Sequence, residues 1–172
     1  MNSRTLSLGV ALAMLAATPA LAQMTIVNPA LAAKIGMPQF QVDPFFPKPL
    51  PNNWLLSQVS GLRFDKNNNL WVTHRAGALT ARELAADKGQ ARCCSKTPPV
   101  LVFDQSGNLL RHWGGPGQGY QWPESEHGIF VDANDFVWLA GNGKKDGQLL
   151  KFTMDGKFVL QIGKSGQGND SN

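Results

Sequence analysis

The chain has little cysteine and histidine, and after its first residues it has no long hydrophobic run. It contains 172 residues, with two cysteines, three histidines and one tyrosine. No stretch after the N-terminus approaches the roughly 20 apolar residues that a membrane-spanning helix requires, so we expect no transmembrane segment. The positive charges are scattered rather than gathered in a basic run, which argues against a nucleic-acid partner. No C-x-x-C motif supports thioredoxin-like chemistry.

The first 22 residues have the pattern of a secretory signal. One positive charge at Arg4 precedes an apolar run over residues 6–17, and the segment closes on Ala20-Leu21-Ala22. A short apolar run followed by small residues is what signal peptidase recognises. The pattern therefore predicts cleavage before Gln23 and a periplasmic or secreted protein.

The two cysteines, Cys93 and Cys94, are neighbours. Their Cα atoms lie about 3.8 Å apart across a trans peptide, below the usual Cα separation of about 4.4–6.8 Å in disulfides. A vicinal disulfide remains possible as a small ring that stiffens a loop, and a bond to a second chain is the other structural alternative. We favour these structural roles over redox chemistry.

An internal repeat is the most informative feature of the sequence. The segment "SGLRFDKNNNLWVTHR" (60–75) aligns with "HGIFVDANDFVWLAGN" (127–142), and "VLVFDQSGNLLRHWGGPGQG" (100–119) aligns with "LLKFTMDGKFVLQIGKSGQG" (149–168). In this alignment Gly61 matches Gly128, Asp65 matches Asp132 and Trp71 matches Trp138. The match predicts two copies of one structural unit.

Each unit has the pattern of four short antiparallel strands. Asp and Asn suit the polar turns because their side chains bond nearby backbone, and glycine supplies the positive φ of a tight hairpin. No window shows sustained helical periodicity, so the chain is predicted to be all-β. The expected first strands are 62–64 and 129–131, the second strands are 70–73 and 137–140, and the hairpins turn at Ser106-Gly107 and Asp155-Gly156.

Two segments lie outside the repeat. Residues 37–54 read as an apolar strand followed by a proline-rich extended arm, which we expect to pack against or close one unit. The connection 76–99 has 24 residues where the second unit has only the six residues 143–148. Long loops on one face of a scaffold often carry function.

A repeat of about 40–50 residues with four strands is typical of a β-propeller blade. The order of glycine, apolar strand, Asp, polar turn, strand and "kF-x-x-x-Gk" resembles NHL-type blades, although Thr73-His74 and Ala140-Gly141 stand where that family usually has Thr-Asp. The resemblance implies an all-β, NHL-type propeller with about two of six blades present. Its expected parts are an extended N-terminal arm (23–57), a blade with a long loop (58–119), and a second blade with a tail (120–172). Because a propeller closes only with four or more blades, we expect an N-terminal fragment of a longer protein.

Two residues are candidates for a site at the mouth of a propeller channel. His127 aligns with Ser60 directly before an innermost strand, where imidazoles from several blades could converge on Zn²⁺. Alternatively, His127 is a polar residue filling a strand start. Arg75 ends a second strand and could bind a carboxylate or oxyanion, or pair with a neighbouring acid on the surface. His74 should point to the opposite face from Arg75, and His112 should lie on the surface.

A closer resemblance assigns roles to these residues. "QVSGLRFDKNNNLWVTHR" and "PESEHGIFVDANDFVWL" are similar to the start of the peptidyl-α-hydroxyglycine amidating lyase domain, a six-bladed propeller. The resemblance implies that His127 is one of three zinc ligands, that Arg75 is the active-site arginine, and that the backbone carbonyls of Leu62 and Ile129 hold Ca²⁺. The implied reaction cleaves an N–C bond at a hydroxylated glycine, releasing an amide and glyoxylate.

Other parts of that family's site would belong to later blades. They are two further zinc histidines, a catalytic tyrosine and a calcium-binding aspartate. Tyr120 matches none of them, and Glu124 and Glu126 either approach a metal beside His127 or remain solvated. We therefore expect the chain by itself to be inactive.

Three functional hypotheses remain open at this point. The first is a secreted, lyase-like propeller that needs Zn²⁺ and Ca²⁺ and takes a small molecule or a peptide C-terminus as substrate. The second is a non-catalytic NHL propeller that binds a protein or carbohydrate, because propellers host many functions. A lactonase-type propeller is less favoured, since such sites use channel-facing acids and these units begin with Ser60 and His127.

Overall fold

The computed structural model of the chain describes residues 34–36, 38, 40–88 and 93–166. The chain divides into two units, Met1–Val42 and Asp43–Asn172, and the fold described below belongs to the second. The expected secretory signal at residues 1–22 lies outside the described residues.

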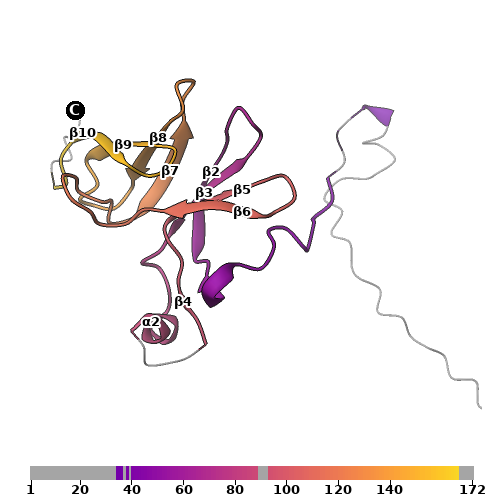
Figure 1. The fold of residues 1–172 in the computed structure, drawn as a ribbon, viewed down its shortest axis with the longest axis horizontal. Coiled ribbons are helices and arrows are strands. Elements are labelled where there is room, and N and C mark those ends of the chain that lie inside the picture. Colours follow the sequence, from indigo (N-terminus) through magenta and orange to yellow (C-terminus); the bar gives the residue numbers. More distant parts are fainter. Residues whose placement is uncertain (1–33, 37, 39, 89–92, 167–172) are drawn as a thin grey trace, which may run out of the picture. The chain divides into compact units, whose positions relative to one another are not determined.

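Two four-stranded antiparallel sheets make up the second unit (Figure 1). In each sheet every strand pairs with its neighbour in sequence, so both are simple meanders. The first sheet contains β2 (Gln58–Phe64), β3 (Leu70–Arg75), β5 (Val100–Phe103) and β6 (Leu109–Trp113). The second contains β7 (Glu126–Val131), β8 (Phe136–Gly141), β9 (Gln148–Thr153) and β10 (Phe158–Gly163). The all-β prediction is confirmed, and the predicted strands fall within β2, β3, β7 and β8.

Four tight turns of the two sheets share one construction. They begin at Asp65, Asp104, Asp132 and Thr153, whose side-chain oxygens accept the backbone N–H four residues later at 2.9–3.1 Å. The fourth residue of each turn has a positive φ: 60° at Asn68, 77° at Gly107, 61° at Asp135 and 79° at Gly156. Asn, Asp and Gly tolerate this left-handed conformation, which explains why the turns could be located in the sequence.

The main core lies between the two sheets. Trp71, Val100 and Val102 of the first sheet form one buried cluster with residues of the second. Strand β7 packs against β2 and β3, and a Cβ added to Gly61 would lie 2.9 Å from the carbonyl oxygen of His127. Glycine at position 61 therefore allows the first strands of the two sheets to approach closely. The partners in the second sheet are Val131, Val137, Leu139, Leu150 and Phe152.

The proline-rich arm covers part of the first sheet. The apolar strand expected at its start is not formed among the described residues, which have no strand before β1 (Trp54–Leu55). Prolines remove the N–H groups that a strand needs, and a short 3₁₀ turn, η1 (Pro51–Asn53), precedes β1. The packing role is confirmed, because Phe46 and Leu50 lie against the buried cluster of Val72, Leu101 and Phe103.

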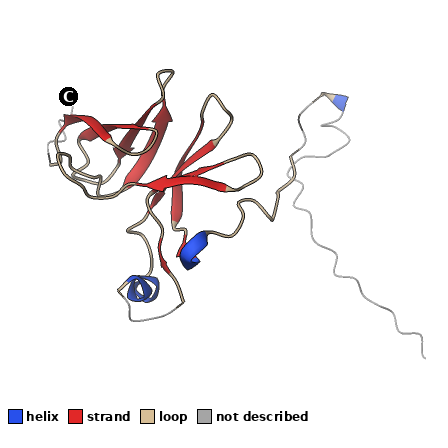
Figure 2. Cartoon of the chain, in the orientation of Figure 1, coloured by secondary structure: helices blue, strands red, loops and turns tan. Residues whose placement is uncertain are grey.

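The connection 76–99 contains α2 (Ala81–Asp87), an α-helix of seven residues (Figure 2). The prediction that no segment is helical is therefore wrong here. Thr80 and Glu83 form a reciprocal capping box: the Glu83 carboxylate accepts the Thr80 N–H at 2.7 Å, and the Thr80 hydroxyl accepts the Glu83 N–H at 3.4 Å. The T-x-x-E pattern at 80–83 was the available signal.

The end of this connection returns to the arm. Strand β4 (Ser95–Lys96) pairs in parallel with β1, and the Thr97 hydroxyl donates to the carbonyl of Leu55 at 2.6 Å. Directly before β4, Cys93 and Cys94 are joined by a disulfide. Of the two alternatives for the cysteines, the structure contains the vicinal bond.

Candidate functional site

The first strands of the two sheets carry β-bulges at equivalent positions. In β2 the pairing shifts between Val59 and Gly61, and in β7 it shifts between Glu126 and Gly128. The bulged residues are thus Ser60 and His127, the pair aligned by the repeat. Bulges re-aim side chains and are common beside functional sites. His127 is exposed there, and its imidazole makes no hydrogen bond within the described residues.

Arg75 lies at the seam between the two sheets. Its Nε is 3.4 Å from the carbonyl oxygen of Glu126, the residue before His127, and its Nη atoms lie 3.4 Å from Gln58 Oε1 and 3.3 Å from Asn142 Oδ1. These are long hydrogen bonds to neutral oxygens. In the described part of the chain Arg75 has no acidic partner, so its charge is available to an anion. The structure does not support the alternative of a surface ion pair.

Asp146, which the sequence reasoning missed, holds the loop before β7. Its carboxylate accepts the backbone N–H of Glu124 at 2.7 Å, of Ser125 at 3.0 Å and of Gly143 at 2.8 Å. A Cβ added to Gly141 would lie 2.2 Å from Asp146 Oδ2, so only glycine leaves room for this carboxylate. The sequence signal for this contact was a single acidic residue in a glycine-rich segment, "GNGKKDG" (141–147).

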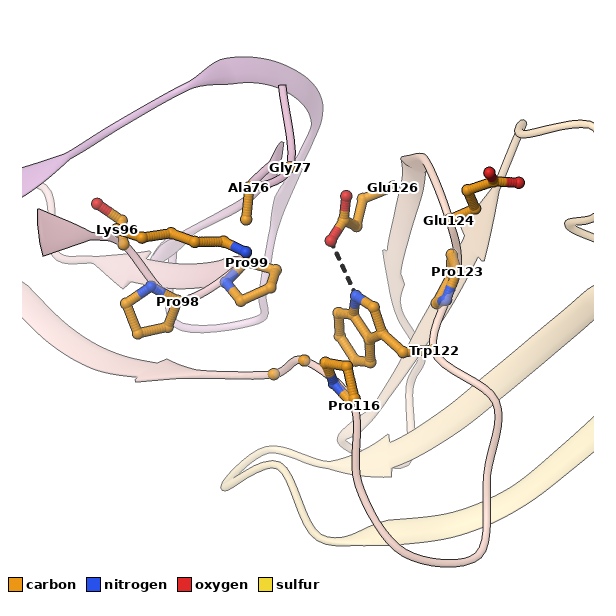
Figure 3. Close-up of a pocket in the computed structure, with 13 residues that line it drawn as sticks. Ala76, Gly77, Lys96, Pro98, Pro99, Pro116, Trp122, Pro123, Glu124 and Glu126 are labelled. Carbon is orange, nitrogen blue, oxygen red and sulfur yellow. Dashed lines mark hydrogen bonds between the residues drawn. The ribbon is translucent and has the colours of Figure 1, made fainter. Parts of the chain in front are cut away.

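A pocket of about 430 Å³ lies beside the seam, between the end of the long connection and the loop that leads into β7 (Figure 3). Glu126 is 7% exposed, and its Oε1 accepts the Trp122 indole N–H at 2.8 Å in the pocket wall. Lys96 and Glu124 line the same pocket, and Glu124 is exposed there. Glu126 therefore contributes to the pocket and bonds Trp122 there.

The other two histidines, His74 and His112, do not join Arg75 and His127 at the seam between the two sheets. His74 is fully buried, and its Nε2 donates to the carbonyl oxygen of Pro98 at 2.9 Å. Burial lowers the pKa of His74 below its ordinary value of 6.5, and the charge of Lys96 adds to this, while the bond to Pro98 opposes it. His112 is exposed on β6 with its ring 4.6 Å from that of Trp54. The positions predicted for both are confirmed.

Tyr120 lies in the loop between β6 and β7 and packs against the main core. Its ring lies 5.2 Å from that of Phe152 and 4.9 Å from that of Phe158, and its hydroxyl donates to the Gly115 carbonyl at 3.0 Å. Burial raises the pKa of Tyr120 above its ordinary value. Its contacts give it a structural role.

The described residues do not form a complete metal site. They hold no group of three or more His, Cys, Asp or Glu side chains that could bind a metal ion. Zn²⁺ takes three or four protein ligands, and the described residues offer only His127 of the ligands that the sequence predicted. Leu62 and Ile129, the residues matched to calcium carbonyls, lie on the neighbouring strands β2 and β7, with Leu62 61% exposed.

Comparison with known proteins leaves the family open. No protein-family model matches the chain, and no curated protein is significantly similar to it in sequence. Among the described residues no helix is long and apolar enough to cross a membrane. The structure itself shows two packed antiparallel sheets, with Arg75 and the His127 bulge at the seam between them.

Proposed function

We propose that the two sheets are consecutive blades of an NHL-type β-propeller, exported by the N-terminal signal. Three observations support this: both sheets are four-stranded meanders, they pack face to face through their first strands, and both first strands have a bulge at the same repeat position. In a propeller the first strand of each blade lines the channel, so His127 on β7 would face it. Arg75 ends the second strand of its sheet and would reach the same place through its contact with the Glu126 carbonyl.

We propose further that this edge belongs to a lyase-like site. The observation that carries the proposal is the juxtaposition of Arg75, which lacks an acidic partner in the described structure, with the bulge that presents His127. Arg75 would bind the carboxylate of a substrate ending in hydroxyglycine. In the reaction the hydroxyl loses its proton, the N–C bond breaks, the amide nitrogen takes up a proton, and glyoxylate leaves.

His127 would be one ligand of a Zn²⁺ ion that polarises the substrate hydroxyl when bound. The remaining ligands and the base must come from outside the described residues, because these supply no further metal-binding group at the edge. We therefore expect the chain by itself to be inactive, and the same limit applies to Ca²⁺ at Leu62 and Ile129.

A non-catalytic binding scaffold is the alternative function. It is favoured by apolar side chains left exposed on the first sheet, where Leu62 is 61% and Phe64 is 60% exposed. Such rows are typical of surfaces that bind another protein.

Zinc titration of protein expressed from the complete coding sequence, followed by NMR of the histidine rings, tests the metal proposal. We expect the His127 signals to shift at lower zinc concentration than those of His112, because both are exposed but only His127 stands beside the seam. His74 is buried and should not respond. Equal responses from His127 and His112 would show an ordinary surface histidine.

Glyoxylate release from a hydroxyglycine-terminated peptide tests the lyase proposal, using protein expressed from the complete coding sequence. We expect His127→Ala and Arg75→Gln to abolish release, His112→Ala to leave it unchanged, and Arg75→Lys to retain part of it. No release by the unmodified, zinc-loaded protein rejects the lyase and leaves the scaffold.

A further inference from the structure

Each sheet has two faces, and the internal interface uses one face of each. The front face of the first sheet, which includes Gly61 and Trp71, is covered by the second sheet. The back face of the second sheet, which includes Ile129 and Val131, lies against it. Trp71 is 0% exposed and Val131 is 7% exposed, so this contact excludes solvent.

The repeat shows which side chains correspond to these on the two faces left open. On the back face of the first sheet, Leu62 and Phe64 correspond to Ile129 and Val131, yet they are 61% and 60% exposed. Val131 buries its side chain only because a neighbouring sheet covers it. Leu62 and Phe64 are apolar side chains at the equivalent positions of β2, but no neighbouring sheet covers them.

The front face of the second sheet is open in the same way. Gly128 corresponds to Gly61, but nothing lies within 4 Å of a Cβ added to Gly128. Phe130 on β7 is 48% exposed, and Ile162 on β10, which corresponds to Trp113, is 56% exposed. The front face of the second sheet is therefore the repeat equivalent of the front face of the first sheet, against which β7 packs.

On the back face of the first sheet, the arm covers the two central strands, β3 and β5, and leaves the edge strand β2 uncovered. Phe46 and Leu50 pack against side chains of β3 and β5, whereas the Leu62 and Phe64 row of β2 stays open. Inside the chain, β7 is the strand that contacts β2 and β3 of the neighbouring sheet. Because β2 is the repeat equivalent of β7, the arm leaves open the strand that would make this contact.

We propose that the Leu62–Phe64 row of one copy docks on the front face of the second sheet of another copy, repeating head to tail the contact that β7 makes with β2 and β3 inside the chain. Such a contact joins different surfaces, so it propagates until the rotation closes a ring. The ring would bring one His127 from each copy to a common rim. That last consequence rests on the proposed function, whereas the docking itself does not.

Sedimentation velocity of the purified chain, with chelator present to exclude metal, tests the docking. We expect the mass to rise with concentration in the micromolar range to a whole-number multiple of the protomer. Leu62→Asp and Gly128→Val should each weaken association by about tenfold or more, because each spoils one of the two faces. Val159→Asp is the control for the first, since Val159 on β10 is 42% exposed, and Gly77→Val is the control for the second, since Gly77 is also open.

Mixing the two variants tests the polarity of the contact. Leu62→Asp retains an intact front face and Gly128→Val an intact back face, so the mixture should form heterodimers at concentrations where each variant by itself is monomeric. Circular dichroism and thermal unfolding establish that each variant is folded. A chain that stays monomeric, association that survives both substitutions, or a mixture that stays monomeric would each overturn the proposal. Because no metal is present, failure here is separate from failure of the zinc test.

Discussion

The two sheets have the same local construction but different surroundings. In both, a turn aspartate accepts a tryptophan indole N–H, from Trp71 to Asp65 at 3.0 Å and from Trp138 to Asp132 at 2.8 Å. Trp71 is nevertheless fully buried between the sheets, while Trp138 is only partly buried, with the Lys151 ammonium 4.8 Å from its ring. The difference shows that position in the stack, rather than local sequence, decides which side chains become core.

The two connections between the second and third strands differ as well. The long one contains a capped helix, a two-residue strand and a vicinal disulfide, whereas the short one has backbone turns and the Asp146 carboxylate, which accepts three backbone N–H groups. Both border the loop that leads into β7. The short connection is therefore ordered by contacts close in sequence and by one carboxylate, whereas the long connection needs its own helix and a strand pairing with β1.

Removing the two tryptophans should give the largest contrast. Trp71→Ala empties a site in the main core and should lower the free energy of unfolding by about 3–5 kcal/mol. Trp138→Ala should cost clearly less, because its side chain is already partly in water. Urea unfolding of both variants measures this, and equal losses would contradict the comparison.

Adding one methyl group to each equivalent glycine should give the next largest contrast. Gly61→Ala would place a Cβ 2.9 Å from the His127 carbonyl oxygen and should lower the free energy of unfolding by about 1–3 kcal/mol. Gly128→Ala meets open space and should change it by less than about 0.5 kcal/mol. The comparison fails if the two variants have the same thermal midpoint.

Acid should weaken the aspartate turns of both sheets. Burial raises the pKa of Asp65, but hydrogen bonds from Trp71, Asn69 and Asn67 outweigh it and leave the pKa below 3.8. The bond from Trp138, followed by that from the Phe136 N–H, lowers the pKa of Asp132 from the same value. A lowered carboxyl pKa contributes stability that is present above 3.8 and is lost as pH falls through the folded-state pKa.

Denaturant unfolding from neutral pH to below pH 3.8 measures these contributions. We expect Asp65→Asn and Asp132→Asn each to flatten the decline in the free energy of unfolding. If both variants decline as steeply as the unmodified chain, the turns are not what acid weakens.

His74 should add a smaller effect in mild acid, confined to the first sheet because Gly141 occupies its place in the second. Burial lowers its pKa below 6.5, so the unfolded chain takes up a proton before the folded chain does. Stability is therefore lost as pH falls from about 6.5 towards the folded-state pKa. His74→Gln should remove this slope and His112→Gln should not, as measured by unfolding between neutral and mildly acidic pH.

Much of the fold could be predicted because its signals are local. The repeat located two similar units, and the Asp, Asn and Gly residues located the turns, since each turn is built from contacts within five residues. The opposite placement of His74 and Arg75 followed from strand alternation. Helix α2 was missed although its T-x-x-E cap is local, because a helix of seven residues has too few turns to show a periodicity.

The amino-acid sequence alone specified two meanders, their turns and the two residues, Arg75 and His127, that mark a candidate site. Only the tertiary structure decided that Arg75 contacts the backbone of Glu126, that Asp146 ties down the loop before β7, and that Leu62 and Phe64 stay exposed while Ile129 and Val131 are covered. Turns and strands depend on neighbours along the chain, whereas these contacts depend on which sheet lies against which. The packing of one repeat on the next depends on contacts between residues far apart in the sequence, which the pattern within a single repeat does not determine.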